Sequence, residues 1–449
     1  MISEKNNIKL KKIKYYSNFN INDIKNKAYH VYPKNIEEIK KIFLYAKKNN
    51  KKILCVGNSK SWFDTISNKN GIIINLKNFK KILSVQKKNI LKVSSNIKLN
   101  EIYNFLISKN LTLFNFPGYS NITIGGSISN NVHGKDSFRF GTFGEKIISM
   151  KILLPTGEIK NCSTKKDKNL FYAIIGGLGL IGIILEIQIK LKKISKNVVT
   201  NSFKCKNYKE IITTIYSGNY KYDYIYSWID TQRERGIIYK SKYYNGKINT
   251  KKKITFKFKD QIIKIILSFF MKNNLMNIIN FFFYLINKKH DSKIERVQNL
   301  INLSQSNFID LPELISPHSF VEIQFIIPQR KNFLLKKFFR VLKEESLSSL
   351  ITGIKLHKKS LGYLSFADNG LSISINLICN FNDKEKITKL RKINSFLVKN
   401  NLKIYLCKDF FINKNDIKKI YPEFNKFLNI KKKYDEFNIL YSDFLKRVV

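Results

Sequence analysis

The sequence predicts an α+β protein with two or three domains. Up to about Ile194, segments with the apolar spacing of helices alternate with short apolar segments typical of strands. From about Ser195 onward, longer strand patterns alternate with long helices, which indicates an antiparallel sheet covered on one side. The 449 residues can bury several cores, and an apolar content of 43% argues against disorder.

The first part of the chain opens with a β-α-β pattern. Residues Ile36–Ala46 have the spacing of a helix with one apolar face, and Lys52–Val56 follows as a short buried strand. Beyond them we expect strands at Gly71–Leu76 and Ile90–Ser95, a helix at Leu99–Lys109 and an extended segment at Leu111–Phe116.

The second part is predicted from longer patterns. Residues Ser319–Ile327 and Leu371–Cys379 alternate as strands do, and a helix is expected between them at Phe333–Leu347. The aromatic segment Tyr222–Asp230 precedes them, and the chain from Tyr405 onward is basic and helical in pattern.

The chain is strongly basic. It carries 82 Lys and Arg against 32 Asp and Glu, a net charge of +50. Such a charge fits a polyanionic partner, either nucleic acid or an anionic membrane. Because Lys is spread evenly and no nucleic-acid recognition fold or zinc spacing accompanies it, we attribute the charge mainly to composition and expect no nucleic-acid partner. Attraction to an anionic membrane is then a by-product.

The cysteines and the hydropathy of the chain indicate the cellular compartment in which the protein works. The five cysteines are widely separated and form no C-x-x-C pair, so we expect a reducing compartment and no metal site. The start MISEKNNIKLKKIKYY lacks the apolar core of a signal peptide, which predicts a cytoplasmic protein. The segment Ile262–Ile286 is interrupted by Lys and Asn and falls short of the ~20 apolar residues of a membrane span. Two interpretations stay open for it: a pair of buried helices, or an amphipathic lid or interfacial anchor flanked by Lys251–Lys253, Lys288 and Lys289.

The run from Pro117 to Gly157 is the most informative segment of the chain. Its glycines let a ligand approach the backbone closely, and short polar side chains lie among them. His133 and Lys135 then place a titratable ring and a cation beside this bare backbone. The run therefore predicts a cofactor cradle.

A second glycine motif, GLGLIG at Gly177–Gly182, formally matches the G-x-G-x-x-G pattern of dinucleotide-binding folds. That pattern must follow a strand and open a helix. Here Asn169–Ile175 has a helical pattern and the residues after Gly182 alternate as a strand. No acidic residue follows about 20 positions later to hold a ribose. We therefore do not expect NAD binding through this motif.

Together these motifs resemble the vanillyl-alcohol-oxidase or PCMH-type FAD-binding family. The resemblance rests on the β-α-β opening, the turn GNSKSWFD, the TIGGSISNNVHG cradle and the GGLGLIGIIL run, in the family's order. The HGK sequence followed by GTFG, together with YSWID, EIQFIIP and YLCKD, is similar to the members that oxidise decaprenylphosphoryl-β-D-ribose. The similarity covers nearly the whole chain and weakens between about Gly236 and Ile315.

The resemblance implies a two-part PCMH-type FAD-binding domain over residues 1–194 and an α+β substrate domain with an antiparallel sheet over residues 195–402. A C-terminal segment, residues 403–449, is implied to return to the first domain. In many relatives a His of the first turn is joined covalently to the flavin. Ser61 or Trp62 stands at that place here, so we expect FAD to be bound non-covalently. The residues implied to bind it are Gly57, Asn58, Ser59, Lys60, Ser61, Trp62, Gly118, Thr123, Ile124, Gly125, Gly126, Ser129, His133, Ile183 and Tyr405.

The resemblance also implies that Lys408 and His133 are catalytic. Oxidation of a secondary alcohol removes a hydride and a hydroxyl proton, so a base or a cation near the hydroxyl must handle the developing charge. The implied substrate-binding residues are Lys135, Glu322, Gln324, Lys355, Ser374 and Lys408. The departures from the family are Glu322 (usually Gln), Trp62 (Tyr), Ser372 (Asn), Ser374 (Cys) and Asn376 (Asp).

The implied function is an FAD-dependent oxidase that converts the C2 hydroxyl of a polyprenyl-phosphate-linked pentose to a 2-keto sugar. This would be the first half of an epimerisation for cell-envelope glycan synthesis, completed by an NAD(P)H-dependent short-chain reductase. The protein is expected to lie peripherally at the inner face of the cell membrane.

Two other functions stay open. An aldonolactone or alditol oxidase of the same fold would act on a soluble sugar. Such enzymes usually carry His-Trp-x-Lys where this chain has Tyr405–Lys408, and Ser or Thr at the place of Lys135. A basic binding protein without catalysis would lack the yellow colour of a flavoprotein.

Overall fold

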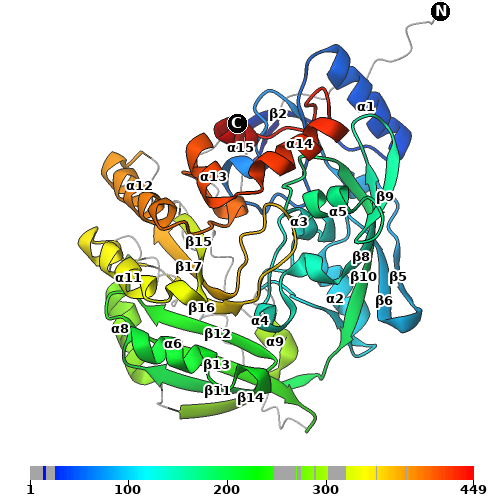
Figure 1. Cartoon of the computed structure of the whole chain (residues 1–449). Coiled ribbons are helices and arrows are strands. Elements are labelled where there is room, and N and C mark those ends of the chain that lie inside the picture. The colour runs from blue at the N-terminus through cyan, green and yellow to red at the C-terminus, as the bar shows by residue number, and fades with distance from the viewer. Residues whose placement is uncertain are drawn as a thin grey trace, which may run out of the picture.

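The described part of the chain forms four β-sheets with helices packed between and around them (Figure 1). The computed structural model describes residues 14–16, 26–246, 269–270, 275–287, 290–301, 320–349, 351–379 and 382–449. The α+β class predicted from the sequence is confirmed by these mixed helices and largely antiparallel sheets.

The first sheet has the strand order β1-β2-β4-β3. Its strands are β1 (Lys14–Tyr16), β2 (Asn26–Val31), β3 (Ile53–Cys55) and β4 (Ile72–Ile74). The predicted β-α-β opening is confirmed, because β4 pairs in parallel with both β2 and β3, and helix α1 (Ile36–Lys48) connects those two. Helix α1 buries one apolar face, and Asn35 caps its start by accepting a hydrogen bond from Glu38 N at 2.9 Å.

The second sheet is antiparallel, with the order β5-β6-β10-β8-β9, and β7 pairs with the far end of β10. Its strands are β5 (Leu83–Gln86), β6 (Ile90–Ser94), β7 (Leu111–Leu113), β8 (Ile147–Leu153), β9 (Ile159–Ser163) and β10 (Ile183–Lys193). Helices α2 (Leu99–Ile107) and α5 (Lys168–Ile174) belong to the same part of the chain. The GLGLIG motif lies between α5 and β10, so the prediction that it does not open a Rossmann helix is confirmed.

The cradle is more regular than its composition suggests. Two short helices form within it, α3 (Ile124–Ser129) and α4 (Ser137–Phe140). The Thr123 hydroxyl starts α3 by accepting a hydrogen bond from Gly126 N at 3.2 Å. Two glycines in six residues hide this helix from an analysis of periodicity, since glycine is a poor helix former.

The third and fourth sheets are antiparallel and lie side by side. The third has the order β12-β13-β11-β14 and the fourth β15-β17-β16. Their strands are β11 (Asn197–Cys205), β12 (Tyr224–Asp230), β13 (Arg235–Tyr244), β14 (His290–Arg296), β15 (Phe320–Pro328), β16 (Ile351–His357) and β17 (Gly370–Ile378). Ser227 Oγ joins β12 to β16, because it donates to Ile354 O at 2.9 Å and accepts from Ile354 N at 2.8 Å.

Helices pack against these two sheets (Figure 1). They are α6 (Tyr208–Tyr216), α8 (Met276–Ile286), α11 (Leu334–Glu344) and α12 (Lys384–Lys399), with α9 (Val297–Ile301) after β14. Of the lipid-like segment Ile262–Ile286, only α8 and its neighbours are among the described residues, and the flanking lysines Lys251–Lys253, Lys288 and Lys289 lie outside them. No helix in the described part of the chain is long and apolar enough to cross a membrane.

The C-terminal segment packs against the first part of the chain. It contains the 3-10 helix η8 (Leu406–Lys408) and helices α13 (Lys414–Ile420), α14 (Phe424–Tyr434) and α15 (Asp443–Val448). Leu440 forms a parallel bridge with Ile53 of β3. The buried ammonium of Lys431 donates to Asp435 Oδ2 at 2.6 Å and to Leu180 O, in the GLGLIG loop, at 2.9 Å. The boundaries at residues 194 and 402 stay predictions.

Candidate active site

A cavity of about 1110 Å³ lies where the cradle, the substrate sheets and the C-terminal segment meet. The turn after β3 and the start of β10 line one side of it. Residues of β12, α8, β15, β16, β17 and η8 line the other. The site therefore combines segments from every part of the sequence.

The turn Gly57–Ser61 is locked against α3. A Cβ atom on Gly57 would lie 2.2 Å from Thr123 Oγ1, so only glycine allows this contact. Asn58 Nδ2 donates to Asn121 O at 2.7 Å, and Ser59 has a φ of +51° that bends the turn. The two loops that the family resemblance implies for FAD thus form one continuous wall.

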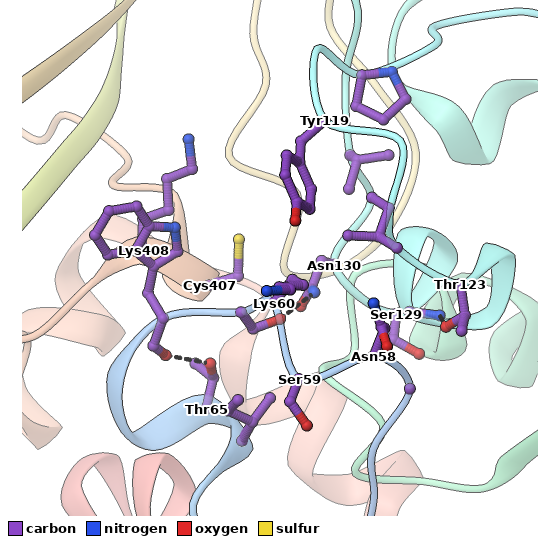
Figure 2. A pocket seen from close by; sticks show the side chains of 18 of the residues that line it. Asn58, Ser59, Lys60, Thr65, Tyr119, Thr123, Ser129, Asn130, Cys407 and Lys408 are labelled. Carbon is purple, nitrogen blue, oxygen red and sulfur yellow. Dashed lines mark hydrogen bonds between the residues drawn. The ribbon is translucent and has the colours of Figure 1, made fainter. Parts of the chain in front are cut away.

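Figure 2 shows this wall beside the segment that carries Cys407 and Lys408. Asn130 links the two loops, since its Nδ2 donates to Ser61 Oγ at 2.7 Å. Asn130 O in turn accepts a hydrogen bond from Tyr405 OH at 2.7 Å. Tyr405 therefore ties the C-terminal segment to the cradle.

Lys408 carries an ion pair at the polar end of the cavity. Its ammonium contacts the carboxylate of Glu322 on β15, which also accepts a hydrogen bond from Ser374 Oγ on β17. Both Lys408 and Glu322 line the cavity. The pair therefore places a hydrogen-bond donor, Lys408 Nζ, at this end of the cavity.

His133 lies in a buried polar cluster beside this pair. Its Nε2 is 2.8 Å from Gln324 Nε2, and its Nδ1 is 3.0 Å from Lys355 Nζ. Gln324 also donates to Ser372 Oγ at 2.9 Å. His357 packs edge-on against His133 with ring centroids 4.8 Å apart, and both of its buried ring nitrogens lack a hydrogen-bond partner among the described residues.

The electrostatics of this cluster favour uncharged bases. Burial, reinforced by the nearby Lys355 ammonium, lowers the pKa of His133 well below its ordinary value. Burial, followed by repulsion from Lys408 and Lys135, lowers the pKa of Lys355 to about 7. His133 is therefore neutral at physiological pH, and Lys355 titrates within that range.

Most of the residues predicted from the resemblance line the cavity. They are Gly57, Asn58, Ser59, Lys60, Ser61, Trp62, Gly118, Thr123, Gly125, Gly126, Ser129, His133, Ile183, Glu322, Lys355, Tyr405 and Lys408. Gln324 and Ser374 lie just behind them and contact His133 and Glu322 respectively. Ile124, the first residue of α3, is fully buried in the core.

The structure does not place Lys135 at the cavity, in contrast to the sequence prediction. Its ammonium donates to Leu300 O at 2.5 Å and lies 3.9 Å from the centre of the Tyr226 ring. These contacts hold the side chain behind β12, so its effect on the cavity is through charge.

Several cavity residues were not predicted. Asn130 lies within the cradle motif, Leu178 and Gly179 belong to the rejected GLGLIG motif, and Met276 and Phe283 are on α8. The cradle's run of short polar residues was a usable signal for Asn130. For α8 the only signal was its aromatic composition, which a buried helix would share.

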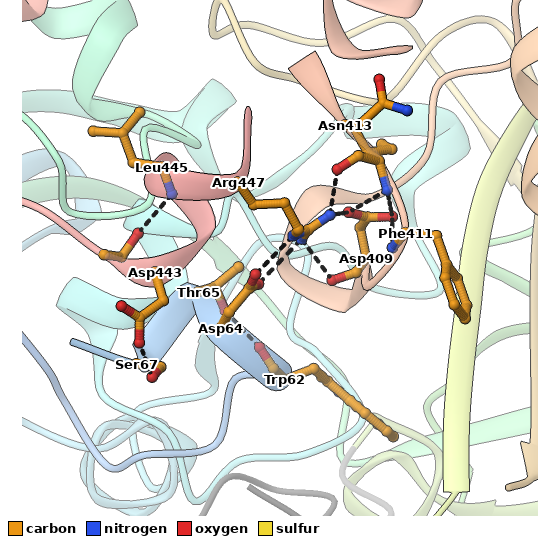
Figure 3. A network of polar contacts seen from close by, with 12 residues as sticks. Trp62, Asp64, Thr65, Ser67, Asp409, Phe411, Asn413, Asp443, Leu445 and Arg447 are labelled. Atoms are coloured by element: carbon orange, nitrogen blue, oxygen red, sulfur yellow. Dashed lines mark hydrogen bonds and ion pairs between the residues drawn. The ribbon is translucent and has the colours of Figure 1, made fainter. Parts of the chain in front are cut away.

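Figure 3 shows an ion-pair network behind the site. Arg447 of α15 donates from Nε to Asp64 Oδ2 at 2.7 Å and from Nη1 to Asp409 Oδ2 at 2.9 Å. Asp64 belongs to the 3-10 helix η1 (Phe63–Ile66), which follows the first turn, and Asp409 follows Lys408 directly. One guanidinium therefore connects the cofactor turn to the segment that carries Lys408.

Comparison with known proteins identifies an FAD-binding domain in the first part of the chain. Residues 28–163 match the FAD binding domain family. The chain is an FAD-dependent oxidoreductase. Its relatives include oxidases that act on CH–OH groups. The PCMH-type FAD-binding domain, the enzyme class and the FAD cofactor that the sequence predicted are confirmed.

The relatives differ in how much of this chain they match. Decaprenylphosphoryl-beta-D-ribose oxidase of Mycolicibacterium smegmatis is 22% identical over 90% of this chain and 90% of its own length. L-gulonolactone oxidase of Mus musculus is 25% identical over 46% of this chain and 47% of its own length. A putative D-arabinono-1,4-lactone oxidase of Neurospora crassa is 30% identical over 36% of this chain and 29% of its own length.

The cavity fits FAD in both size and lining. Its volume of about 1110 Å³ accommodates a dinucleotide, and its wall of small residues between Gly57 and Gly126 exposes backbone to a ligand. The turn Gly57–Ser61 and the Thr123–Gly126 segment would hold the pyrophosphate. His133, Ile183 and Tyr405 would border the flavin.

We expect Arg447→Met to lower the free energy of unfolding by about 3 kcal/mol, because Asp64 and the buried Asp409 lose their shared cation. The matched control is Arg139→Met, since Arg139 pairs with Asp223 at the surface, where the loss is at most about 1 kcal/mol. Thermal unfolding of both variants and flavin retention on gel filtration check this. Equal midpoints of thermal unfolding for the two variants would contradict a stabilising role of the Arg447 ion pairs.

The buried His357 predicts how the stability of the protein changes with pH. Burial, together with Lys355, lowers the pKa of His357 well below its ordinary value, so the unfolded chain binds a proton below pH ~6.5 that the folded protein does not. Stability therefore falls as the pH falls, by about 1.4 kcal/mol per pH unit for each such histidine. We expect His357→Phe to lose less stability than the wild type between pH 7.5 and 5.5 in urea unfolding. Identical losses would refute this assignment.

Proposed function

We propose that the protein is an FAD-dependent oxidase that converts the C2 hydroxyl of a polyprenyl-phosphate-linked pentose to the 2-keto sugar. The proposal extends the established class, an FAD-dependent oxidoreductase acting on CH–OH groups, to a particular substrate. It is supported by the extent of similarity to the decaprenylphosphoryl-beta-D-ribose oxidase, which spans 90% of both chains.

One structural observation carries the proposal: the cavity has a polar end and an apolar side. Glu322, Lys355 and Lys408 form the polar end. Trp228 and Phe283, whose ring centroids lie 4.7 Å apart, belong to the apolar lining. A sugar attached to a lipid matches this division, because each part meets groups of its own polarity.

The chemistry divides between cofactor and protein. FAD, when bound, supplies the acceptor for the hydride. The chain's residues bind and orient the sugar, exclude water and remove the hydroxyl proton. Lys408 contacts the carboxylate of Glu322 and lines the cavity, so its part is to donate hydrogen bonds to the sugar. The absence of His from the first turn supports non-covalent binding of FAD.

Helix α8 supports a peripheral contact with the inner face of the membrane. Its Met276, Ile279 and Phe283 line the cavity, whereas Leu285 and Ile286 are exposed by 50% and 76%. Apolar side chains exposed on a chain with a net charge of +50 suit an anionic lipid surface. A lipid substrate could then pass from the membrane along α8 to the cavity.

The oxidation of the C2 hydroxyl also implies a partner enzyme that reduces the 2-keto sugar. A 2-keto sugar becomes the epimer of the starting sugar only when a hydride returns to the opposite face. We therefore place an NAD(P)H-dependent short-chain reductase after this enzyme, in the synthesis of a cell-envelope glycan.

The second candidate is an aldonolactone or alditol oxidase acting on a soluble sugar. Its support is the match to lactone oxidases, which covers 46% of this chain or less. Anaerobic visible spectroscopy separates the candidates. Bleaching of the flavin by phospholipid-linked ribose, and not by free lactones or alditols, is the expected result. Bleaching by the soluble sugars alone would favour the second candidate, and a protein without flavin absorbance would exclude both.

We expect Lys408→Ala to retain FAD and to lose turnover by a factor of at least about 100, because the sugar loses a charged donor. Lys414→Ala, on the exposed start of α13, is the matched control and should behave as wild type. The flavin spectrum and steady-state rates of both variants check this. Full activity of Lys408→Ala would remove Lys408 from the mechanism.

A further inference from the structure

The polar end of the cavity is lined by two lysines with opposite surroundings. Lys408 is paired with a carboxylate, and its nitrogen has no lone pair while it remains an ammonium. Lys355, on β16, contacts His133 instead, with Nζ 3.0 Å from Nδ1. Both side chains reach the cavity, so either could meet a substrate hydroxyl.

The hydrogen bonds around His133 indicate the state of Lys355. In the orientation that the Gln324 amide takes, Nε2 lies 2.8 Å from His133 Nε2 and donates to it, and Oε1 has no hydrogen-bond partner among the described residues. The neutral ring then carries its proton on Nδ1. That proton faces Lys355 Nζ, which can accept it only as an uncharged amine.

The charges around Lys355 agree with this state. Lys408 and Lys135 repel an ammonium there, and His133 and His357 are neutral neighbours. The nearby carboxylates are already paired, Glu322 with Lys408 and Asp136 with Lys192 at 2.7 Å. Burial adds to these effects and brings the pKa of Lys355 to about 7.

We propose that Lys355 is the catalytic base of this enzyme and that Lys408 is not. This rests on the proposed oxidation of a sugar hydroxyl. Gln324 and His133 act as positioning residues that keep Lys355 uncharged in the resting enzyme. The carboxylate of Glu322, where the family usually has Gln, occupies Lys408 in an ion pair and so leaves the proton transfer to Lys355.

The step balances as follows in atoms and electrons. The C2–H bond breaks and its electron pair leaves as a hydride, with FAD as the oxidant. The O–H bond breaks, its proton joins the lone pair of Lys355 Nζ, and its electrons form the C=O bond. Nζ turns from His133 to the hydroxyl in this step, and above pH ~7 the new ammonium returns its proton to solvent.

A pH profile tests the proposal. Because the base must be deprotonated, kcat/KM should rise with pH through an apparent pKa of about 7 and then level off. Lys355→Met should lower kcat/KM by a factor of about 10² to 10⁴ and lose this rise. Lys355→Ala should regain activity with added methylamine. Lys408→Met should be slow and keep the rise, moved to higher pH because Lys355 loses a repelling charge.

A second measurement does not depend on turnover. Competitive labelling of the FAD-loaded protein with acetic anhydride between pH 6 and 11, read by mass spectrometry, reports the titration of each lysine. Lys355 should titrate near pH 7, well below the value of about 10.4 of a free lysine side chain.

The outcomes separate this proposal from the proposed function. Failure of every tested sugar to bleach the flavin would overturn the function, while the labelling would still report on Lys355. A substrate that bleaches the flavin, combined with ordinary titration of Lys355 or with a rise near pH 7 that persists in Lys355→Met, would overturn Lys355 as the base.

Discussion

Tyr405 makes the contacts on which the whole site depends. Its backbone N donates to Gln324 O on β15 at 2.7 Å, and its hydroxyl donates to Asn130 O in the cradle at 2.7 Å. One residue therefore joins the C-terminal segment, the substrate sheet and the cofactor wall. Since Lys408 follows three residues later, these two hydrogen bonds also determine where its ammonium lies relative to Glu322 and His133.

The chemistry of the cavity follows from an unequal distribution of countercharges. Three lysines lie in or behind its polar end, yet only Lys408 has a carboxylate in contact among the described residues. The Lys135 ammonium contacts a backbone carbonyl and an aromatic ring, and Lys355 Nζ contacts the ring of a neutral histidine. Identical side chains thereby acquire different protonation states, which is how one cavity can supply both a cation and a base.

Periodicity predicted the larger elements because their burial repeats along the chain. The helix at Ile36–Lys48 and the strands at Phe320–Pro328 and Gly370–Ile378 agree with the predicted ranges to within about two residues. Helix α3 was missed because its stability comes from the Thr123 cap and from packing on Gly57, which periodicity does not report. Lys135 was misplaced because a motif specifies neighbours in sequence and not the direction of a long side chain.

The sequence by itself determined the class of protein, the cofactor and most of the residues around the cavity. These are local properties: glycine turns, a short polar run and alternating strands, each contained in one segment. The tertiary structure alone decided the roles of the lysines, since Glu322, His133, Lys355 and Lys408 come from four separate segments. A lysine's charge depends on what faces it across a fold, and only three-dimensional packing sets those distances.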